Sequence, residues 1–487
     1  MASALDVKRL GLGVAAALLM AALVWFGTGL DPFWPLMWFA PLPVLLFANR
    51  AAWWSSALVA ALGVMLGLLN LWHVFHGLLG APLPVLAQIY LSEGIVYALA
   101  VSLYRALLQR GAYWAALLAF PAVIVCFEFF LDLTSPHGTS GSLAYSQLQF
   151  LPFLQLASVT GPWGMSFLLL AFSTALAVGL HVYPEAPKRA LRLTGGVVAL
   201  LVLVLACGAW RLHEPVQGTH VKVGLVSSDA GANDDVADPG QPAARLFQDY
   251  SVPVEQLAAQ GARVVVLPEK LAVVLDGQTA DATDGYFQKL VDRTGAAVVV
   301  GVIRVAKDGK KYNEARVYMA GRPPMSYDKQ HMLPPFESML TPGTSLTLLP
   351  RADAMWGVEI CKDMDFSALS ADYGKKGVSL MLVPGWDFVA DRIFHGHMAI
   401  MRGVESGFSI VRSAKQGSLY VSDDRGRVLA EITSNSAPFV TLMARVPAVH
   451  HDTFYMVAGD WFAWISLLLL LGTLGWLIWI RKTPARR

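Results

Sequence analysis

The sequence has few charged residues and almost no net charge. Asp, Glu, Lys and Arg make up 15% of the 487 residues, and the formal net charge is +2. This balance gives no reason to expect a nucleic-acid partner, which a strongly basic chain would favour. With 55% hydrophobic residues and a mean hydropathy of +0.50, the chain is also too apolar for an ordinary soluble protein. The composition therefore predicts membrane spans.

Cysteine is scarce as well. The three cysteines, Cys126, Cys207 and Cys361, cannot form a disulfide framework. The first two lie in apolar runs that we interpret as membrane spans, which leaves Cys361 as an unpaired thiol. The sequence also lacks internal repeats and low-complexity segments.

What the chain does have is long apolar runs. Seven are long enough to cross a bilayer: Leu10–Leu30, Trp53–Trp72, Val85–Tyr104, Ala112–Leu131, Pro162–Leu180, Gly195–Trp210 and Trp461–Ile480. Trp34–Ala48 is a shorter candidate that contains three prolines, so it could be a kinked or re-entrant segment. We therefore expect a helical membrane domain of about eight spans.

The distribution of positive charge predicts the orientation of these spans. If all eight cross, one set of short loops carries Lys and Arg, from Lys8 and Arg9 near the start to Arg486 and Arg487 at the end. The opposite short loops carry none. Because cytoplasmic loops are enriched in Lys and Arg, we expect both termini in the cytoplasm and the segment before the last span outside.

This outward segment differs in composition from the rest. Strand-like runs such as 221–226, 297–303 and 379–383 alternate with helical patterns such as 243–260 and 284–293, which favours an α/β layered domain. We expect a membrane domain at 1–217, a globular domain at 218–456, and a last span with a cytoplasmic basic tail at 457–487.

Three strand ends in the outward domain finish on reactive groups. Glu269 follows Val264-Val-Val-Leu-Pro268, Lys329 follows Tyr327-Asp328, and Cys361 follows Trp356-Gly-Val-Glu-Ile360. A carboxylate, an amine and a thiol suit a base, an oxyanion stabiliser and a nucleophile. Taken singly, each has a plainer interpretation as a turn carboxylate, a solvated lysine or a buried small hydrophobic residue.

Together these residues resemble the nitrilase, or carbon-nitrogen hydrolase, superfamily. The resemblance rests on Leu267-Pro-Glu269, Tyr327-Asp-Lys-Gln-His-Met-Leu-Pro-Pro-Phe-Glu337 and Ile360-Cys-Lys-Asp363. It implies an α-β-β-α sandwich with Glu269 as general base, Lys329 as oxyanion stabiliser and Cys361 as nucleophile. Glu337 matches a second glutamate near the nucleophile. An oxyanion hole would combine Lys329 with a backbone amide near Lys362.

A domain of this kind before the last of eight spans is similar to a membrane branch, the apolipoprotein N-acyltransferases. The resemblance implies transfer of an acyl chain from a phospholipid, through a cysteine thioester, to the N-terminal amine of a diacylglyceryl-cysteine lipoprotein. It also implies a bacterial inner-membrane monomer whose catalytic domain faces the periplasm, with no metal or cofactor.

Some positions depart from that branch, which usually has an aromatic residue and then glutamate after the nucleophile. Here Lys362 and Asp363 follow Cys361, and the first strand runs into Ser227-Ser-Asp229, which leaves the acceptor open. Trp386 and Asp387 fall where the superfamily lines its pocket, although a packed indole and a turn aspartate fit equally.

Two other functions fit the same residues. A membrane-tethered amidase or nitrilase would use the same carboxylate, amine and thiol, with water in place of the acceptor amine. A catalytically silent protein that binds lipid or a partner is the second alternative. Acyl-chain and phospholipid preference do not follow from the sequence.

Overall fold

The computed structural model describes residues 4–215, 218–229, 236–352 and 354–482. The chain divides into two compact units, one made of 1–133, 141–211 and 460–487 and the other of 134–140 and 212–459. The expected domain boundary at 217 and the end of the expected basic tail at 483–487 lie outside the described residues.

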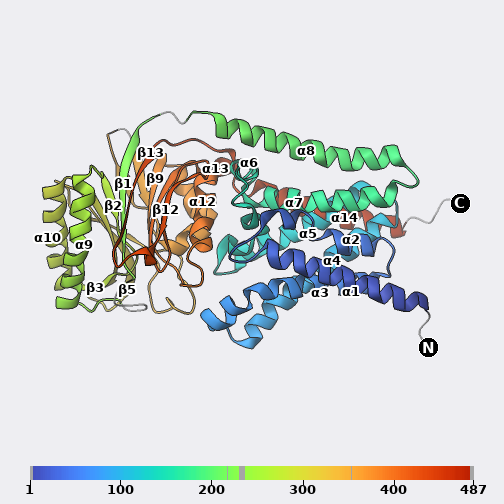
Figure 1. Ribbon diagram of the computed structural model, residues 1–487, viewed down its shortest axis with the longest axis horizontal. Coiled ribbons are helices and arrows are strands. Elements are labelled where there is room, and N and C mark those ends of the chain that lie inside the picture. Colours follow the sequence, from blue (N-terminus) through green and yellow to red (C-terminus); the bar gives the residue numbers. More distant parts are fainter. Residues whose placement is uncertain (1–3, 216–217, 230–235, 353, 483–487) are drawn as a thin grey trace. The chain divides into compact units, whose positions relative to one another are not determined.

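The first unit is helical (Figure 1). Its longer helices are α1 (Ala4–Gly27), α3 (Trp53–Leu68), α4 (Leu83–Leu108), α5 (Tyr113–Thr134), α7 (Ala157–Val182), α8 (Pro187–His213) and α14 (Trp461–Lys482). Shorter turns of helix are η2 (Leu69–Leu71), η3 (His73–Leu78), η5 (Leu143–Gln147) and α6 (Leu151–Leu154). Within the described residues, seven helices are long and apolar enough to cross a membrane. They coincide with the seven long apolar runs of the sequence.

The shorter candidate, Trp34–Ala48, does not form one continuous helix. It is split into η1 (Trp34–Trp38) and α2 (Leu42–Ala48), because prolines restrict the backbone before them and lack a donor N–H. Polar side chains from distant helices hold it. The indole of Trp38 donates to Gln147 Oε1 at 2.9 Å, and the hydroxyl of Ser173 donates to the Trp38 carbonyl. The segment is therefore packed inside the helical unit, although it is shorter than its neighbours.

The second unit contains two β-sheets. The first has seven strands in the order β13-β1-β2-β4-β5-β6, with β3 paired to β4. Its strands are β1 (His220–Ser227), β2 (Val264–Val266), β3 (Ala272–Leu275), β4 (Ala297–Val305), β5 (Lys311–Tyr318), β6 (Met325–Asp328) and β13 (Val440–Pro447). Strands β1, β2 and β4 run parallel to one another. Their carboxyl ends therefore meet at one edge of the sheet.

The second sheet has six strands in the order β12-β11-β10-β9-β8-β7. These are β7 (Leu348–Pro350), β8 (Met355–Val358), β9 (Val378–Trp386), β10 (Ser409–Lys415), β11 (Ser418–Ser422) and β12 (Val428–Thr433). Strands β8, β9 and β10 are parallel. Their carboxyl ends also meet, so each sheet gathers several strand ends at one edge.

Helices cover the outer face of each sheet, which gives the expected α-β-β-α layers (Figure 1). Helices α9 (Gln241–Ala259) and α10 (Thr279–Thr294) pack on the first sheet, and α11 (Ser367–Gly374), α12 (Phe394–Ser406) and α13 (Phe454–Ala458) lie on the side of the second. The core under α9 and α10 includes stacked rings of Phe287 and Tyr318 at 5.1 Å between centroids. The inner faces of the sheets are joined by hydrogen bonds, such as that from the Ser413 hydroxyl to the Val226 carbonyl at 2.8 Å.

Candidate active site

The first sheet contributes a carboxylate and an amine to one buried cluster. Glu269 follows β2 and Lys329 directly follows β6. The ammonium of Lys329 donates to Glu269 Oε1 and to Glu337 Oε2, both at 2.9 Å. The three side chains are no more than 2% exposed. The structure therefore brings together three residues that lie up to 68 positions apart in the sequence.

Two further residues complete this cluster. The ammonium of Lys270 lies 2.6 Å from Glu337 Oε1, and the amide of Asn313 on β5 donates to both Glu269 and Glu337 at 2.5 and 2.9 Å. We call Glu269, Lys270, Lys329 and Glu337 the first ionic group. It holds two ammonium groups against two carboxylates, so its formal charges balance.

These contacts perturb the ionisation of the group. Burial alone would lower the pKa of Lys329, but the carboxylates of Glu269 and Glu337 outweigh it and raise that pKa well above its usual value. Burial would raise the pKa of Glu337, but the ammonium groups of Lys329 and Lys270 hold it well below its usual range. Both groups are therefore charged at neutral pH.

The second sheet contributes the thiol. Cys361 follows β8, begins the short 3-10 helix η6 (Cys361–Asp365) and is 7% exposed. Its Sγ lies 3.6 Å from the carbonyl oxygen of Trp386 at the end of β9. Burial and the nearby carboxylate of Glu269 raise the pKa of the thiol to about 11, against opposing effects of nearby cations. The resting thiol is therefore protonated at neutral pH, and it needs a base in order to attack.

The backbone is strained around this cluster. Among the described residues, the non-glycine residues with positive φ are Lys270, Cys361 and Gln416, at 49°, 46° and 53°. Left-handed backbone costs such residues about 1–3 kcal/mol each, and it persists where the surrounding structure enforces it, often at functional sites. Lys270 belongs to the first ionic group, Cys361 carries the thiol, and Gln416 accepts a hydrogen bond from the indole of Trp386 at 3.1 Å. All three strained positions thus surround one location.

Asp363, one of the departures noted in the sequence, joins the middle motif to the loop of Cys361. Its buried carboxylate accepts hydrogen bonds from the Tyr327 hydroxyl at 2.8 Å and from the backbone N–H groups of Ile360, Gln330 and His331 at 3.2, 3.1 and 2.9 Å. The Nδ1 atom of His331 lies 3.0 Å from the same carboxylate. Asp363 therefore fixes the position of Cys361 relative to the end of β6, which Lys329 follows.

The three remaining candidates also surround the thiol. The Lys362 ammonium forms an ion pair with Asp365 at 3.1 Å. The indole ring of Trp386 is faced by the ammonium groups of Lys415 and Lys270, at 3.4 and 5.1 Å from its centroid. Asp387 is 2% exposed and accepts two hydrogen bonds from Arg412 at 2.6 and 2.8 Å. Its carboxylate is therefore a buried ion-pair partner rather than a turn aspartate.

Several residues at this location were not predicted from the sequence: Lys270, Asn313, Asp365, His395 and Arg412. For two of them, the sequence contains a pattern that could have predicted a buried polar contact. Asn313 and Arg412 are polar residues within strands that are mostly buried, and buried polar groups need partners. Lys270, Asp365 and His395 lie in or next to loops, where the sequence does not indicate which distant group they meet.

Among the described residues, one set of possible metal ligands converges near the thiol. The donor atoms of Cys361, Asp387 and His395 all lie within 4.8 Å of one another. Both carboxylate oxygens of Asp387 already accept hydrogen bonds from the Arg412 guanidinium, which also lies 3.9 Å from Cys361 Sγ. A metal cation here would face a fixed positive charge, so the set does not suit a metal ion.

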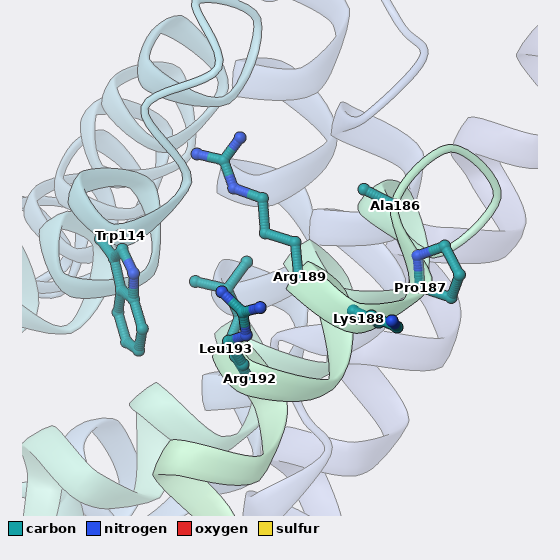
Figure 2. A pocket seen from close by; sticks show the side chains of 7 residues that line it. All are labelled: Trp114, Ala186, Pro187, Lys188, Arg189, Arg192 and Leu193. Carbon is teal, nitrogen blue, oxygen red and sulfur yellow. The ribbon is translucent and has the colours of Figure 1, made fainter.

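A separate pocket of about 520 Å³ lies in the helical unit and contains none of these residues (Figure 2). It is lined by Trp114, Ala186, Pro187, Lys188, Arg189, Arg192 and Leu193. Figure 2 shows the guanidinium groups of Arg189 and Arg192 apart from each other, so these cations do not converge on one point. Its basic residues lie in the first two turns of α8, at the end of the helix that the charge distribution predicts to be cytoplasmic.

Two family models match separate parts of the chain. The model for the apolipoprotein N-acyltransferase N-terminal domain matches residues 15–175, and the model for carbon-nitrogen hydrolase matches residues 243–448. Apart from residues 134–140, the first match lies within the helical unit, and the second lies within the layered unit. The protein is therefore a membrane protein that carries a nitrilase-like domain.

Relatives that align with most of the chain identify the class of protein more narrowly. The chain is 27% identical over 482 residues to an apolipoprotein N-acyltransferase of Geobacter metallireducens, with 88% of each chain covered. It is 26% identical over 400 residues to one of Pseudomonas aeruginosa, covering 73% of this chain and 74% of that protein. The chain belongs to the apolipoprotein N-acyltransferase family of bacterial membrane proteins. An amidase structure from Nesterenkonia sp. aligns with 49% of this chain and 93% of its own, at 18% identity and a TM-score of 0.41.

Proposed function

We propose that this protein transfers a fatty acyl chain from a phospholipid, through a thioester on Cys361, to the N-terminal amine of a diacylglyceryl-cysteine lipoprotein. The observation that supports this most is the assembly of Glu269, Lys329 and Cys361 from two sheets in one buried cluster. Family membership supports the choice of donor and acceptor.

In the first half-reaction, Glu269 acts as the base. Its Oε1 is bonded to Lys329 and Asn313, while its buried Oε2 has no hydrogen-bond partner among the described residues. This oxygen takes the thiol proton as Sγ attacks the ester carbonyl carbon, and a C–S bond forms. The C–O bond then breaks, and the proton passes from Glu269 to the departing oxygen of the lysophospholipid.

The second half-reaction reverses these roles. The acceptor amine attacks the thioester carbonyl, and Glu269 takes the amine proton as the C–N bond forms. The C–S bond then breaks, and Sγ recovers its proton from Glu269. In both halves, the Lys329 ammonium and a backbone N–H near Lys362 stabilise the tetrahedral oxyanion, each donor contributing about 3 kcal/mol.

A lipid donor is supported by exposed apolar side chains next to the cluster. Phe336 and Met339, on the loop that carries Glu337, are 46% and 68% exposed. Val389 and Ile393, on the loop after Trp386, are 53% and 45% exposed. The two loops touch through the ring of Phe336, 5.6 Å from that of Phe388. Apolar groups beside a polar site suit a substrate with an acyl chain and contact with a bilayer.

We further propose that the layered unit faces the periplasm and that both termini are cytoplasmic, in the inner membrane. This orientation requires an even number of crossings, so Trp34–Ala48 must cross together with the seven long helices. Its buried residues, which include Met37, Val44 and Leu45, are shielded by neighbouring helices. Irregular backbone at membrane depth is tolerated when protein surrounds it. We expect the protein to act as a monomer.

The covalent intermediate provides the test. Purified full-length protein incubated with phospholipid should gain the mass of one acyl chain on Cys361, labile to neutral hydroxylamine. A diacylglyceryl-cysteine peptide should remove it. Cys361→Ala should abolish the adduct, while Cys126→Ala should retain it. Glu269→Gln and Lys329→Ala should each slow formation of the adduct by about 100-fold or more. The first variant removes the base that takes the thiol proton, and the second removes the cation that stabilises the oxyanion.

The other outcomes identify the alternatives. Rapid loss of the acyl group to water, with the peptide unmodified, would indicate a membrane-tethered hydrolase. Absence of an adduct on the parent protein with every phospholipid tested would leave a binding protein as the better account.

A further inference from the structure

A second set of buried charges lies beside Cys361. The Arg412 guanidinium lies 3.9 Å from Cys361 Sγ and pairs with Asp387. The ring of His395 bridges two carboxylates, with Nδ1 3.2 Å from Asp387 and Nε2 3.3 Å from Asp365. Asp365 in turn pairs with Lys362 at 3.1 Å. We call Lys362, Asp365, Asp387, His395 and Arg412 the second ionic group.

The fold holds the Arg412 guanidinium in a fixed place. Arg412 is on the central strand β10 and is 1% exposed. A Cβ atom added to Gly385 would lie 3.0 Å from its guanidinium, and one added to Gly396 would also lie 3.0 Å from it. The absence of side chains at these two glycines therefore leaves space for the group, while the two bonds to Asp387 orient it. Arg412 is thus aligned before any substrate binds.

The charge balance of the two ionic groups differs. In the first group, two carboxylates offset the ammonium groups of Lys329 and Lys270. In the second group, three cations face the two carboxylates of Asp365 and Asp387. With His395 protonated, one positive charge is therefore left over within the second group, and the Arg412 guanidinium contacts the sulfur. A thiolate on Cys361 would compensate that charge.

We propose that Arg412 is a second catalytic cation, which stabilises the Cys361 thiolate, and that His395 is a positioning residue that holds Asp387 and Asp365 around it. Lys329 is then free to serve the oxyanion of the substrate, because the sulfur has its own positive partner. This inference rests on the proposed function and adds to it. Arg412 stabilises the thiolate of Cys361, and Lys329 stabilises the oxyanion of the substrate.

The other charged groups around the Cys361 sulfur are compatible with these separate roles for Arg412 and Lys329. Burial and Glu269 raise the pKa of the Cys361 thiol, whereas Lys329, His395 and Arg412 lower it. Burial alone would lower the pKa of His395. The carboxylates of Asp365 and Asp387 outweigh burial and raise that pKa well above its usual value. Asp391 also faces His395 and accepts its backbone N–H at 3.0 Å, and burial raises the pKa of that carboxyl.

The test measures the thiolate directly and does not depend on acyl transfer. Full-length protein in detergent is treated with iodoacetamide between pH 7 and 9.5, and alkylation of the peptide containing Cys361 is followed by mass spectrometry. Below the thiol pKa, the rate is proportional to the thiolate fraction, so a rise of one pKa unit slows it tenfold. The alkylation rate of Cys361 therefore tests the role of Arg412 even if the protein does not transfer acyl chains.

Arg412→Met should slow alkylation at least tenfold, and Arg412→Lys should restore part of the rate, because it keeps a positive charge. His395→Gln should slow alkylation several-fold. The matched control is His397→Gln on the same helix, whose imidazole pairs with Glu431 at 2.8 Å and does not belong to the second ionic group. This control should alkylate at the parental rate.

Folding is checked by the melting temperature of each variant. If Arg412→Met does not fold, Gly396→Ala supplies the test, because its methyl group displaces the guanidinium without removing it. Slower alkylation of Gly396→Ala and His395→Gln would support the proposal. Parental alkylation rates in the folded Arg412 variant, or in both of these other variants, would overturn it. Equal rates for Arg412→Met and Arg412→Lys would indicate a structural role instead.

Discussion

The Asp363 carboxylate offers a quantitative test of how the site is held together. The substitution Asp363→Asn keeps the shape of the side chain but replaces a charged acceptor with an amide. The Tyr327 hydroxyl could rotate and accept a hydrogen bond from the new NH₂ group. The Ile360 N–H, which donates to the same oxygen in the parent at 3.2 Å, could not. One buried donor would therefore lose its partner.

The expected loss of stability follows from these bonds. A buried donor without an acceptor costs about 1–3 kcal/mol, and a hydrogen bond to a charged group contributes about 1 kcal/mol more than a neutral one. The bonds from Gln330 and His331 would become neutral. We expect a loss of about 3–5 kcal/mol, which lowers the melting temperature of a domain of this size by about 6 °C or more.

The assay is thermal unfolding of the full-length protein in detergent, together with formation of the acyl adduct on Cys361. The control is Asp372→Asn on α11, because Asp372 is 59% exposed and forms a surface ion pair with Lys375, which contributes at most about 1 kcal/mol. The Asp363 variant should also form the adduct more slowly, since the position of Cys361 relative to Lys329 is no longer fixed. A melting temperature within about 2 °C of the parent would show that these hydrogen bonds do not hold the site together.

Two other predictions concern pH and topology. Because the folded pKa of Glu337 is depressed, its contribution to stability is present above the unfolded pKa of about 4.3 and is lost as the pH falls below it. The melting temperature should therefore fall less steeply between pH 6 and 3 in Glu337→Gln than in the parent, and equal slopes would contradict this. For topology, in a background without Cys126 and Cys207, Asp281→Cys should react with an impermeant thiol reagent from outside intact cells, and Lys188→Cys should not. Labelling of Lys188→Cys would reverse the proposed orientation.

The local features of this protein follow from its amino-acid sequence alone. Seven long apolar runs became seven helices of spanning length, because span length depends on composition over about 20 residues. The expected strands at 221–226, 297–303 and 379–383 correspond to β1, β4 and β9. The reactive residues at strand ends could be identified because an apolar run that stops at a charged or nucleophilic residue is a local pattern.

Which side chains come into contact depends instead on how the strands and helices pack together. Arg412 and Cys361 are 51 residues apart and in contact, and the sequence of neither strand indicates the other as a partner. The same holds for Asn313, which joins the two carboxylates, and for Asp363, which the sequence presents only as a departure from the family pattern. Ion pairs form where packing brings charged groups together out of water, and that packing depends on the pairing of strands across two sheets. Local composition specifies the elements, whereas long-range packing specifies the charge environment of the thiol.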